Sequence, residues 1–271
     1  QYINQTPASI VTTLKDIGYT CVAMHPYYET GWSRNQVYPK LGFDETHFID
    51  DFDQNNIIRE YITDQEMYNK IIDRYETKAS NENLFIMGIT MQNHGGYTDT
   101  YSNFPEEIYK TGRSYTDVNQ YLSLVHESDK AIQNLITYFE HVDDPVEIVF
   151  FGDHQPNDTV ASSVLAANGM DYNNLSNEEL KLRYQVPYVI WANYDIDEAT
   201  GEDTSVNYLA ANVLKAAGVP TNDYQSFLLK LKEEYPIISA VRTDKTAGKT
   251  SDMLNDYKLL QYYRLFEWED K

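Results

Sequence analysis

Cysteine is almost absent from this 271-residue sequence, and basic residues are few. Because Cys21 is the one cysteine, no disulfide can form within the chain, and this usage suits both a cytosolic protein and a bacterial surface protein. Lysine and arginine number 21 against 42 acidic residues, which gives a formal net charge of −21. Such a surface repels a phosphate backbone, so we expect no nucleic-acid partner. The acidic surface does not exclude a small phosphorylated ligand, because salt screens distant charges beyond roughly 8 Å. Such a ligand would need a local arginine or metal ion to hold it.

Long apolar runs are missing as well. The longest, LFIMGITM and VEIVFF, have the length of strands and fall short of the roughly 20 residues that a membrane helix needs. A P-loop and the GxGxxG, GxSxG and CxxC motifs are also missing, which removes the usual signatures of nucleotide, serine-hydrolase and dithiol chemistry. The chain begins at Gln1 without a signal-like segment. We expect an excised or processed piece, from which membrane anchors could have been removed.

The remaining composition is that of a globular protein, with 42% hydrophobic and 23% charged residues. Continuous apolar runs alternate with helical patterns, which predicts an α/β fold with a mostly parallel sheet and helices on both faces. The expected strands are 19–24, 84–91, 146–152 and 186–193, and the expected helices are 64–79, 116–141, 205–218, 222–235 and 251–268.

Local sequence features predict the structure of two further segments. Thr6 and Pro7 predict an N-cap and first turn of a helix that ends at Gly18. The polar segment 155–183 is expected to be a loop with one short helix.

Histidines follow three of the four expected strands. HPYYETGWSRN comes after 19–24, QNHGGY after 84–91, and GDHQPND after 146–151. In open α/β sheets, ligands bind beyond the carboxyl ends of the strands. We therefore expect these three segments to form one cleft.

Asp153 and His154 are the strongest candidates for metal ligands. A carboxylate and an imidazole on a loop that leaves a strand can both turn toward one divalent cation, and Gly152 permits the sharp backbone path. The alternative is an Asp-His turn that bonds only to the backbone. Two ligands do not complete a coordination shell, so others must come from elsewhere.

His94, Trp32 and Arg34 are the candidates for substrate contact. His94 precedes two glycines that let a ligand approach the backbone, and it could donate a proton or hold a phosphoryl oxygen. Arg34 offers a planar fork to a phosphate, and Trp32 offers an apolar wall. Structural roles remain open for all three, and we expect His25 to pack in the core rather than to line the cleft.

In this order, the three segments resemble the sulfatase-type domain of lipoteichoic acid synthases and related phosphoglycerol transferases, a branch of the alkaline phosphatase superfamily. GWSRNQVYPKLGFD resembles the family's tryptophan–x–arginine substrate motif. MQNHGGY is similar to its asparagine–histidine loop, and FFGDHQ to its Gly-Asp-His metal motif. The similarity runs from about Thr6 to Val219.

The resemblance implies roles for these residues. Asp153 and His154 would bind one divalent cation, Mn²⁺ or Mg²⁺, and Trp32 and Arg34 would hold the glycerol-phosphate headgroup. His94 would contact the glycerophosphate and assist proton transfer. The implied reaction passes glycerophosphate from phosphatidylglycerol, through a threonine nucleophile, to an acceptor hydroxyl of the cell envelope.

The sequence departs from the family pattern at its start. The family's nucleophilic threonine and a glutamate ligand lie upstream of the segment that Trp32 and Arg34 match, and residues 1–31 offer no matching threonine. We therefore expect an N-terminally truncated domain that is inactive as a transferase and binds metal poorly. Residues 1–271 would form one partial catalytic domain, with a core of about 6–219 and a C-terminal helical part over 220–271.

Two alternatives stay open. One is a sulfatase, phosphodiesterase or phosphoethanolamine transferase of the same superfamily, which shares the metal site but differs in nucleophile and headgroup pocket. The other is a non-catalytic module that binds cell-wall polymer or lipid headgroups. By resemblance, the domain lies on the extracellular face of the bacterial cytoplasmic membrane, held by N-terminal helices that this chain lacks.

Overall fold

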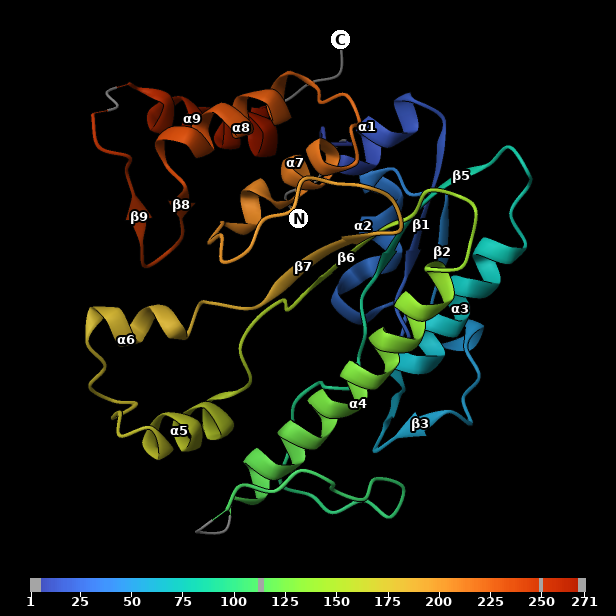
Figure 1. Ribbon diagram of the computed structural model, residues 1–271, viewed down its shortest axis with the longest axis vertical. Helices are drawn as coiled ribbons and strands as arrows, with labels where there is room; N and C mark the ends of the chain where they lie inside the picture. Colours follow the sequence, from blue (N-terminus) through green and yellow to red (C-terminus); the bar gives the residue numbers. More distant parts are fainter. Residues whose placement is uncertain (1–5, 112–114, 249–250, 268–271) are drawn as a thin grey trace.

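The computed structural model describes residues 6–111, 115–248 and 251–267. At its centre is a parallel three-stranded sheet in the order β2-β1-β5 (Figure 1). β1 spans Tyr19–Met24, β2 spans Glu45–His47 and β5 spans Asn83–Gly88. The strands of this sheet are parallel, as the continuous apolar runs predict. β5 ends at Gly88, earlier than the expected residue 91.

Alternate residues of β1 face two different layers of helices, because successive side chains of a strand point to opposite faces. Val22 and Met24 pack in a core cluster with Met67 of α3 (Asp64–Glu76) and Leu135 of α4 (Thr116–Phe139). Cys21 and Ala23 pack in a second cluster on the other face. That cluster includes residues of α1 (Ile10–Asp16), α2 (Arg34–Leu41) and α7 (Val206–Ala216). The expected α/β fold with helices on both faces is confirmed.

The first helix begins later than Thr6 and Pro7 predict. Ser9 is the N-cap of α1, and its side chain accepts a hydrogen bond from the Thr12 amide while Thr12 bonds back to the Ser9 amide. This reciprocal capping box satisfies two amides that no helical carbonyl can reach, so it determines the start of the helix. The prediction of a cap at Thr6 is wrong.

The fourth strand runs in the direction opposite to the one expected. β6 (Glu147–Phe151) pairs with β7 (Tyr188–Ala192) in an antiparallel ladder, in which Phe151 lies opposite Tyr188. The intervening chain leaves β6 at its carboxyl end and returns at the same end, so β7 must run back along β6. The polar residues 193–197 therefore follow β7 at the far end of the pair, away from the loop that contains Asp153.

The polar segment between these strands holds two helices rather than one. They are α5 (Asp158–Ala167), which Asn157 caps, and α6 (Asn177–Leu182), which Ser176 caps. Both helices lie apart from the central sheet in Figure 1. The remaining elements are α8 (Asp223–Glu234), α9 (Met253–Tyr262), the hairpins β3–β4 (Ile57–Ile58, Tyr61–Ile62) and β8–β9 (Ile237–Ile238, Thr243–Asp244), the 3₁₀ turns Gly31–Ser33 and Ile49–Asp51, and a π-helical turn Tyr263–Glu267. No helix in the described ranges is long and apolar enough to cross a bilayer.

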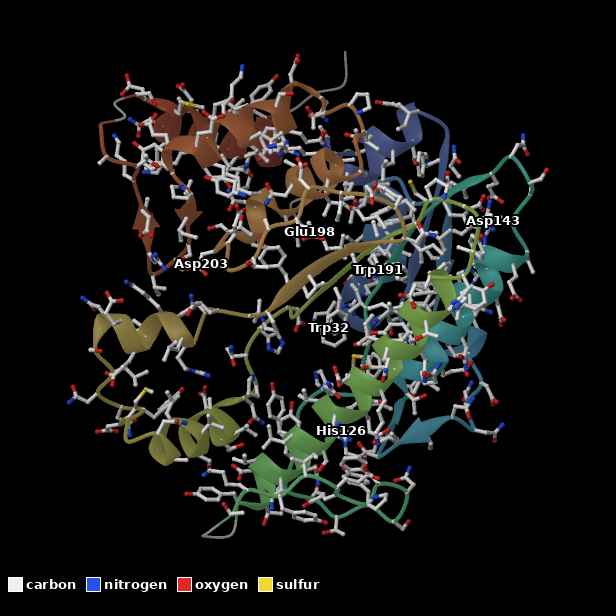
Figure 2. All side chains as sticks on the ribbon, viewed as in Figure 1. Trp32, His126, Asp143, Trp191, Glu198 and Asp203 are labelled. Carbon is white, nitrogen blue, oxygen red and sulfur yellow. The ribbon has the colours of Figure 1, made fainter. Side chains whose placement is uncertain are left out.

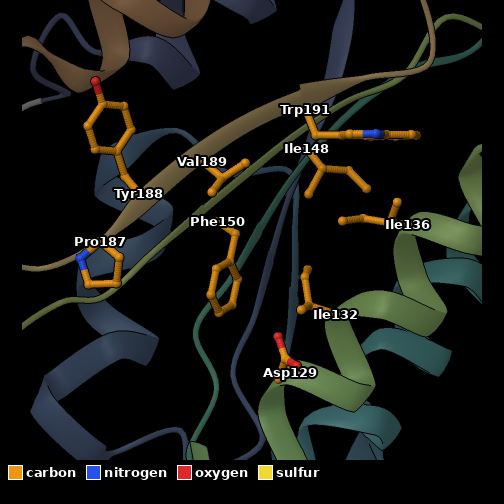
Figure 3. A pocket seen from close by; sticks show the side chains of 9 residues that line it. All are labelled: Asp129, Ile132, Ile136, Ile148, Phe150, Pro187, Tyr188, Val189 and Trp191. Atoms are coloured by element: carbon orange, nitrogen blue, oxygen red, sulfur yellow. The ribbon is translucent and has the colours of Figure 1, made fainter. Parts of the chain in front are cut away.

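An apolar groove of about 230 Å³ lies between α4 and the β6–β7 pair (Figure 3). Ile132 and Ile136 of α4 face Ile148, Phe150 and other residues of the strands across it. In the part of the chain that the structure describes, β6 forms a ladder with β7 only, and β5 forms one with β1 only. None of the candidate site residues lines this groove.

Candidate functional site

Trp32 and Arg34 lie where a short 3₁₀ turn passes into α2. Trp32 and Ser33 both have left-handed backbone angles, with φ values of 52° and 57°. These two residues form a kink between the turn and the helix, and the kink leaves the Trp32 residue 60% exposed. In Figure 2, Trp32 lies near the centre of the view, between the ribbons of the β6–β7 pair and α4. The indole is thus presented outward instead of being packed in the core.

The Arg34 guanidinium lies over the Trp32 ring, 4.5 Å from its centroid. This cation–π contact holds the guanidinium plane in place. The Nη1 atom of Arg34 is buried and has no hydrogen-bond partner. A buried charged donor without a partner is costly, so this atom is suited to bind an anionic oxygen.

His94 lies next to this pair, on the loop that follows β5. Its ring centroid is 6.2 Å from that of Trp32 and 5.6 Å from that of Tyr61. The Tyr61 hydroxyl is 3.2 Å from His94 Nδ1, which leaves Nε2 as the nitrogen available to a ligand. The structure thus brings together three of the predicted residues, Trp32, Arg34 and His94.

His25 lies beside the same group, and its expected packing in the core is confirmed. It is fully buried, and its Nδ1 is 2.8 Å from the Ile89 carbonyl oxygen, but its Nε2 has no partner. Its ring lies 6.0 Å from the Trp32 ring. Burial, together with the nearby charges of Arg34 and His94, lowers the pKa of His25 to about 4, so the ring is neutral at pH 7. The sequence feature that indicates its location beside the site is its position immediately after β1.

Asp153 and His154 lie on the loop that follows β6, as expected. Their side chains are 78% and 76% exposed, and His154 Nε2 is 3.4 Å from Asp153 Oδ2. His154 Nδ1 is 2.7 Å from the Gln155 carbonyl oxygen, which fixes this nitrogen as the protonated one. Asp153 Oδ1 accepts a hydrogen bond from the His154 amide, so His154 Nε2 and Asp153 Oδ2 are the two atoms that can turn toward a cation.

This loop contacts the loop of His94. A Cβ atom built on Gly95 would lie 3.6 Å from Asn157 Nδ2, which is an ordinary van der Waals distance. The charge of Asp153 also acts on Tyr97, two residues beyond Gly95. The carboxyl ends of β1, β5 and β6 therefore contribute to one region of the surface.

The two candidate metal ligands on the β6 loop are of types that bind divalent cations, but they are too few to complete a coordination shell. A carboxylate is a common ligand of both Mn²⁺ and Mg²⁺, whereas an imidazole nitrogen held by a backbone carbonyl suits a transition-metal ion such as Mn²⁺ better than Mg²⁺. Among the described residues, however, no group of three or more His, Cys, Asp or Glu side chains could hold a metal ion. Asp153 and His154 can thus supply two ligands.

Comparison with known proteins places the chain in a family. The family model described as Sulfatase matches residues 1–219. A putative cyclic β-1,2-glucan modification protein of Rhizobium meliloti is 24% identical over 98% of this chain, and the match covers 44% of that protein. The chain thus spans less than half the length of this relative.

Two solved structures share the fold. The phosphoglycerol transferase GacH of Streptococcus pyogenes, in complex with sn-glycerol-1-phosphate, has a TM-score of 0.69 and 21% identity, over 93% of this chain and 66% of that one. The lipoteichoic acid synthase LtaP of Listeria monocytogenes has a TM-score of 0.64 and 20% identity, over 82% of this chain and 55% of that one. These likenesses confirm the fold expected from the resemblance to this branch of the alkaline phosphatase superfamily, and the family match shows that the chain belongs to the sulfatase family.

Proposed function

We propose that this chain is the headgroup-binding part of a metal-dependent phosphoglycerol transferase. Such an enzyme would move glycerophosphate from phosphatidylglycerol to a hydroxyl of a cell-envelope acceptor. The observation that carries the proposal is the Arg34 guanidinium, which lies over an exposed indole and keeps one buried nitrogen without a partner. The fold match to a phosphoglycerol transferase in complex with sn-glycerol-1-phosphate supports the same ligand class.

Each residue of the site has a distinct task in this proposal. The Arg34 fork holds the phosphoryl oxygens, and the Trp32 face packs against the glycerol carbons. When the Tyr61 hydroxyl donates to His94 Nδ1, His94 Nε2 carries the proton and can donate it in a hydrogen bond to a phosphoryl or leaving oxygen. The neutral ring of His25 offers a further nitrogen, Nε2, to the same region.

Asp153 and His154 would hold a divalent cation, Mn²⁺ or Mg²⁺, at the neighbouring loop. When bound, such an ion would neutralise charge on the phosphoryl group and polarise its oxygens. Because two protein ligands leave most of a coordination shell to other groups, we propose that this chain alone binds the ion weakly.

We further propose that the chain alone does not catalyse transfer. The hydroxyls of Thr12 and Thr13 each donate to the Ser9 carbonyl, at 3.0 Å, within the first turn of α1. They are therefore engaged in the helix and are poor candidates for the nucleophile. Since the donor is a membrane lipid, the enzyme would act at the extracellular face of the bacterial cytoplasmic membrane. The name of the Rhizobium meliloti relative suggests a glucan hydroxyl as one acceptor.

Calorimetric titration with sn-glycerol-1-phosphate tests the binding site. Arg34→Ala is expected to weaken binding by at least about tenfold, because it removes a charged fork from the phosphate. Trp32→Ala is expected to weaken it less. Adding Mn²⁺ to the unmodified chain is expected to change the affinity less than Arg34→Ala does, since the cation ligands are incomplete here.

Arg264→Ala is a matched control. Arg264 also lies over an aromatic ring, 3.8 Å from the centroid of Tyr224, but it donates to the Ala8 carbonyl oxygen before α1. This variant is expected to leave the affinity unchanged. Equal affinities for the Arg34 and Arg264 variants would overturn the proposed headgroup site.

The same titrations separate the alternatives. Tighter binding of sulfate or phosphoethanolamine than of sn-glycerol-1-phosphate would favour a sulfatase or a phosphoethanolamine transferase. Binding of a wall polymer that is insensitive to Arg34→Ala would favour a non-catalytic module.

A further inference from the structure

Arg59 is a buried arginine that no sequence motif marks. It lies in the two-residue turn between β3 and β4, and it is only 4% exposed. Its backbone is left-handed, with a φ of 58°. Residues other than glycine pay an energetic penalty in this region, so contacts of the folded chain must hold Arg59 there.

The guanidinium of Arg59 donates to three backbone carbonyls of the loop that contains His94. Nη2 is 2.8 Å from the Gln92 oxygen and 2.7 Å from the His94 oxygen, and Nη1 is 2.6 Å from the Gly96 oxygen. A longer contact of 3.4 Å reaches the side-chain oxygen of Gln120. These are all uncharged oxygens, so the positive charge is stabilised by oriented carbonyl dipoles.

The same hairpin also contacts the His94 ring. Tyr61 begins β4, two residues after Arg59, and its hydroxyl is 3.2 Å from His94 Nδ1. The Arg59 guanidinium lies over both the Tyr61 and the Tyr97 rings, 5.6 Å and 5.5 Å from their centroids. One short hairpin therefore holds the backbone of the His94 loop and one nitrogen of its ring.

We propose that Arg59 is the positioning residue of His94, and that the β3–β4 hairpin sets both the place and the tautomer of that imidazole. The inference rests on the proposed function, in which His94 Nε2 faces the phosphoryl group. Three carbonyls at alternate positions of one loop converge on a single guanidinium, and only a planar fork with several donors can bind them together. A lysine at this position would bind one carbonyl at a time and leave the loop free to rearrange.

The test combines two measurements on Arg59→Lys and Arg59→Met. Nuclear magnetic resonance of the ring nitrogens, assigned with a His94→Gln variant, reports the tautomer and the number of conformations of His94. Titration with sn-glycerol-1-phosphate reports the affinity. Arg59→Lys is expected to give more than one His94 conformation and to weaken binding by about tenfold, the effect of losing one well-placed charged hydrogen bond.

Tyr61→Phe isolates the contact to the ring. It removes the hydroxyl beside His94 Nδ1 and keeps the three carbonyl bonds of Arg59. The expected result is a shift of the His94 tautomer toward a protonated Nδ1, with a single loop conformation retained.

Arg74→Lys is the control for a purely structural effect. Arg74 also makes several hydrogen bonds at once, to Glu45 and Glu82, and it has no contact with the site. It is expected to lower the melting temperature while the His94 signals and the affinity stay unchanged. If Arg59→Lys behaves in the same way as Arg74→Lys, Arg59 is structural and the inference fails.

The ligand-free His94 signals separate this inference from the proposed function. If the unmodified chain does not bind sn-glycerol-1-phosphate, the proposed function fails, and the ring-nitrogen signals still decide whether Arg59 positions His94. Should Arg59→Met fail to fold, Arg59→Lys retains the charge and carries the test.

Discussion

Buried ionisable residues surround the candidate site, and Asp64 is the clearest of them. Asp64 is 2% exposed, and it accepts a 2.5 Å hydrogen bond from the Ser128 hydroxyl. Burial raises the pKa of Asp64 to about 6. The folded chain therefore keeps a proton that the unfolded chain loses above its ordinary pKa of 3.8.

This difference in protonation predicts how Asp64→Asn changes stability with pH. Between pH 3.8 and about 6 the folded state binds more protons, so the contribution of Asp64 to stability is full below pH 3.8 and is lost as the pH rises to about 6. The change is roughly 3 kcal/mol for a shift of this size. Relative to the unmodified chain, Asp64→Asn is thus expected to be more stable at pH 7 than at pH 4 by about that amount, as measured by urea unfolding.

Asp73→Asn is the matched control, since Asp73 lies exposed on the same helix, α3. This variant makes the same chemical change without removing a buried carboxyl, so its stability difference from the unmodified chain is expected to vary less between the two pH values than that of Asp64→Asn. A pH-independent effect of Asp64→Asn would show that the buried carboxyl stays charged in the fold.

Residue types and their places after strands were sufficient to predict Trp32, Arg34 and His94 as neighbours. The carboxyl ends of parallel strands meet at one edge, so side chains far apart in sequence come together there. Arg59 escaped the same reasoning for a physical reason. Its role depends on burial and on which polar atoms find partners, and neither property is encoded in local sequence.

At the scale of elements, the kink before α2 is the feature that exposes Trp32. Ser33 is exposed and left-handed at φ 57°, a backbone state that costs roughly 1 kcal/mol or more for residues with a Cβ atom. Ser33→Gly is therefore expected to raise the free energy of unfolding by roughly 1 kcal/mol in urea unfolding.

Ser162→Gly is expected to have the opposite sign. Ser162 lies within α5, where glycine lowers stability by roughly 0.5 kcal/mol relative to serine. If both glycine variants lower stability, the left-handed backbone at Ser33 is not a source of strain.

Helices and strands could be predicted where a single local sequence pattern determines them. They could not be predicted where the path of the chain between distant segments determines them. The run 19–24 became β1 because a continuous apolar strand can be buried on both faces. The direction of β7 could not be predicted, because it depends on where the chain returns after α5 and α6. The start of α1 depended on a choice between two caps, and the reciprocal bonds of Ser9 and Thr12 prevailed over proline at the first turn.

At the scale of the whole molecule, the net charge of −21 opposes the approach of an anion. At about 10 mM salt the screening length is about 30 Å, so the entire surface repels the ligand, whereas at 150 mM it is about 8 Å. The association rate constant for sn-glycerol-1-phosphate is therefore expected to rise severalfold between these salt concentrations. Stopped-flow mixing, followed by the fluorescence of the exposed Trp32, measures it.

A fall of the rate constant with added salt would contradict this prediction. It would mean that the local positive charge of Arg34 and Arg59 controls the encounter, and that the acidic surface has little effect at the distance of the site.

The separation between the β6–β7 pair and the β2-β1-β5 sheet has a mechanical consequence for the site. In the described ranges no backbone ladder joins the two, and side chains such as Ile148 and Trp191 pack the pair against the central core cluster. Trp32, Arg34 and His94 are carried by one sheet, and Asp153 and His154 by the other. The candidate site therefore spans two sheets that are joined by side-chain packing alone. This packing sets the spacing between the proposed cation ligands and the proposed phosphate ligands, and we expect that it can change without breaking a strand hydrogen bond.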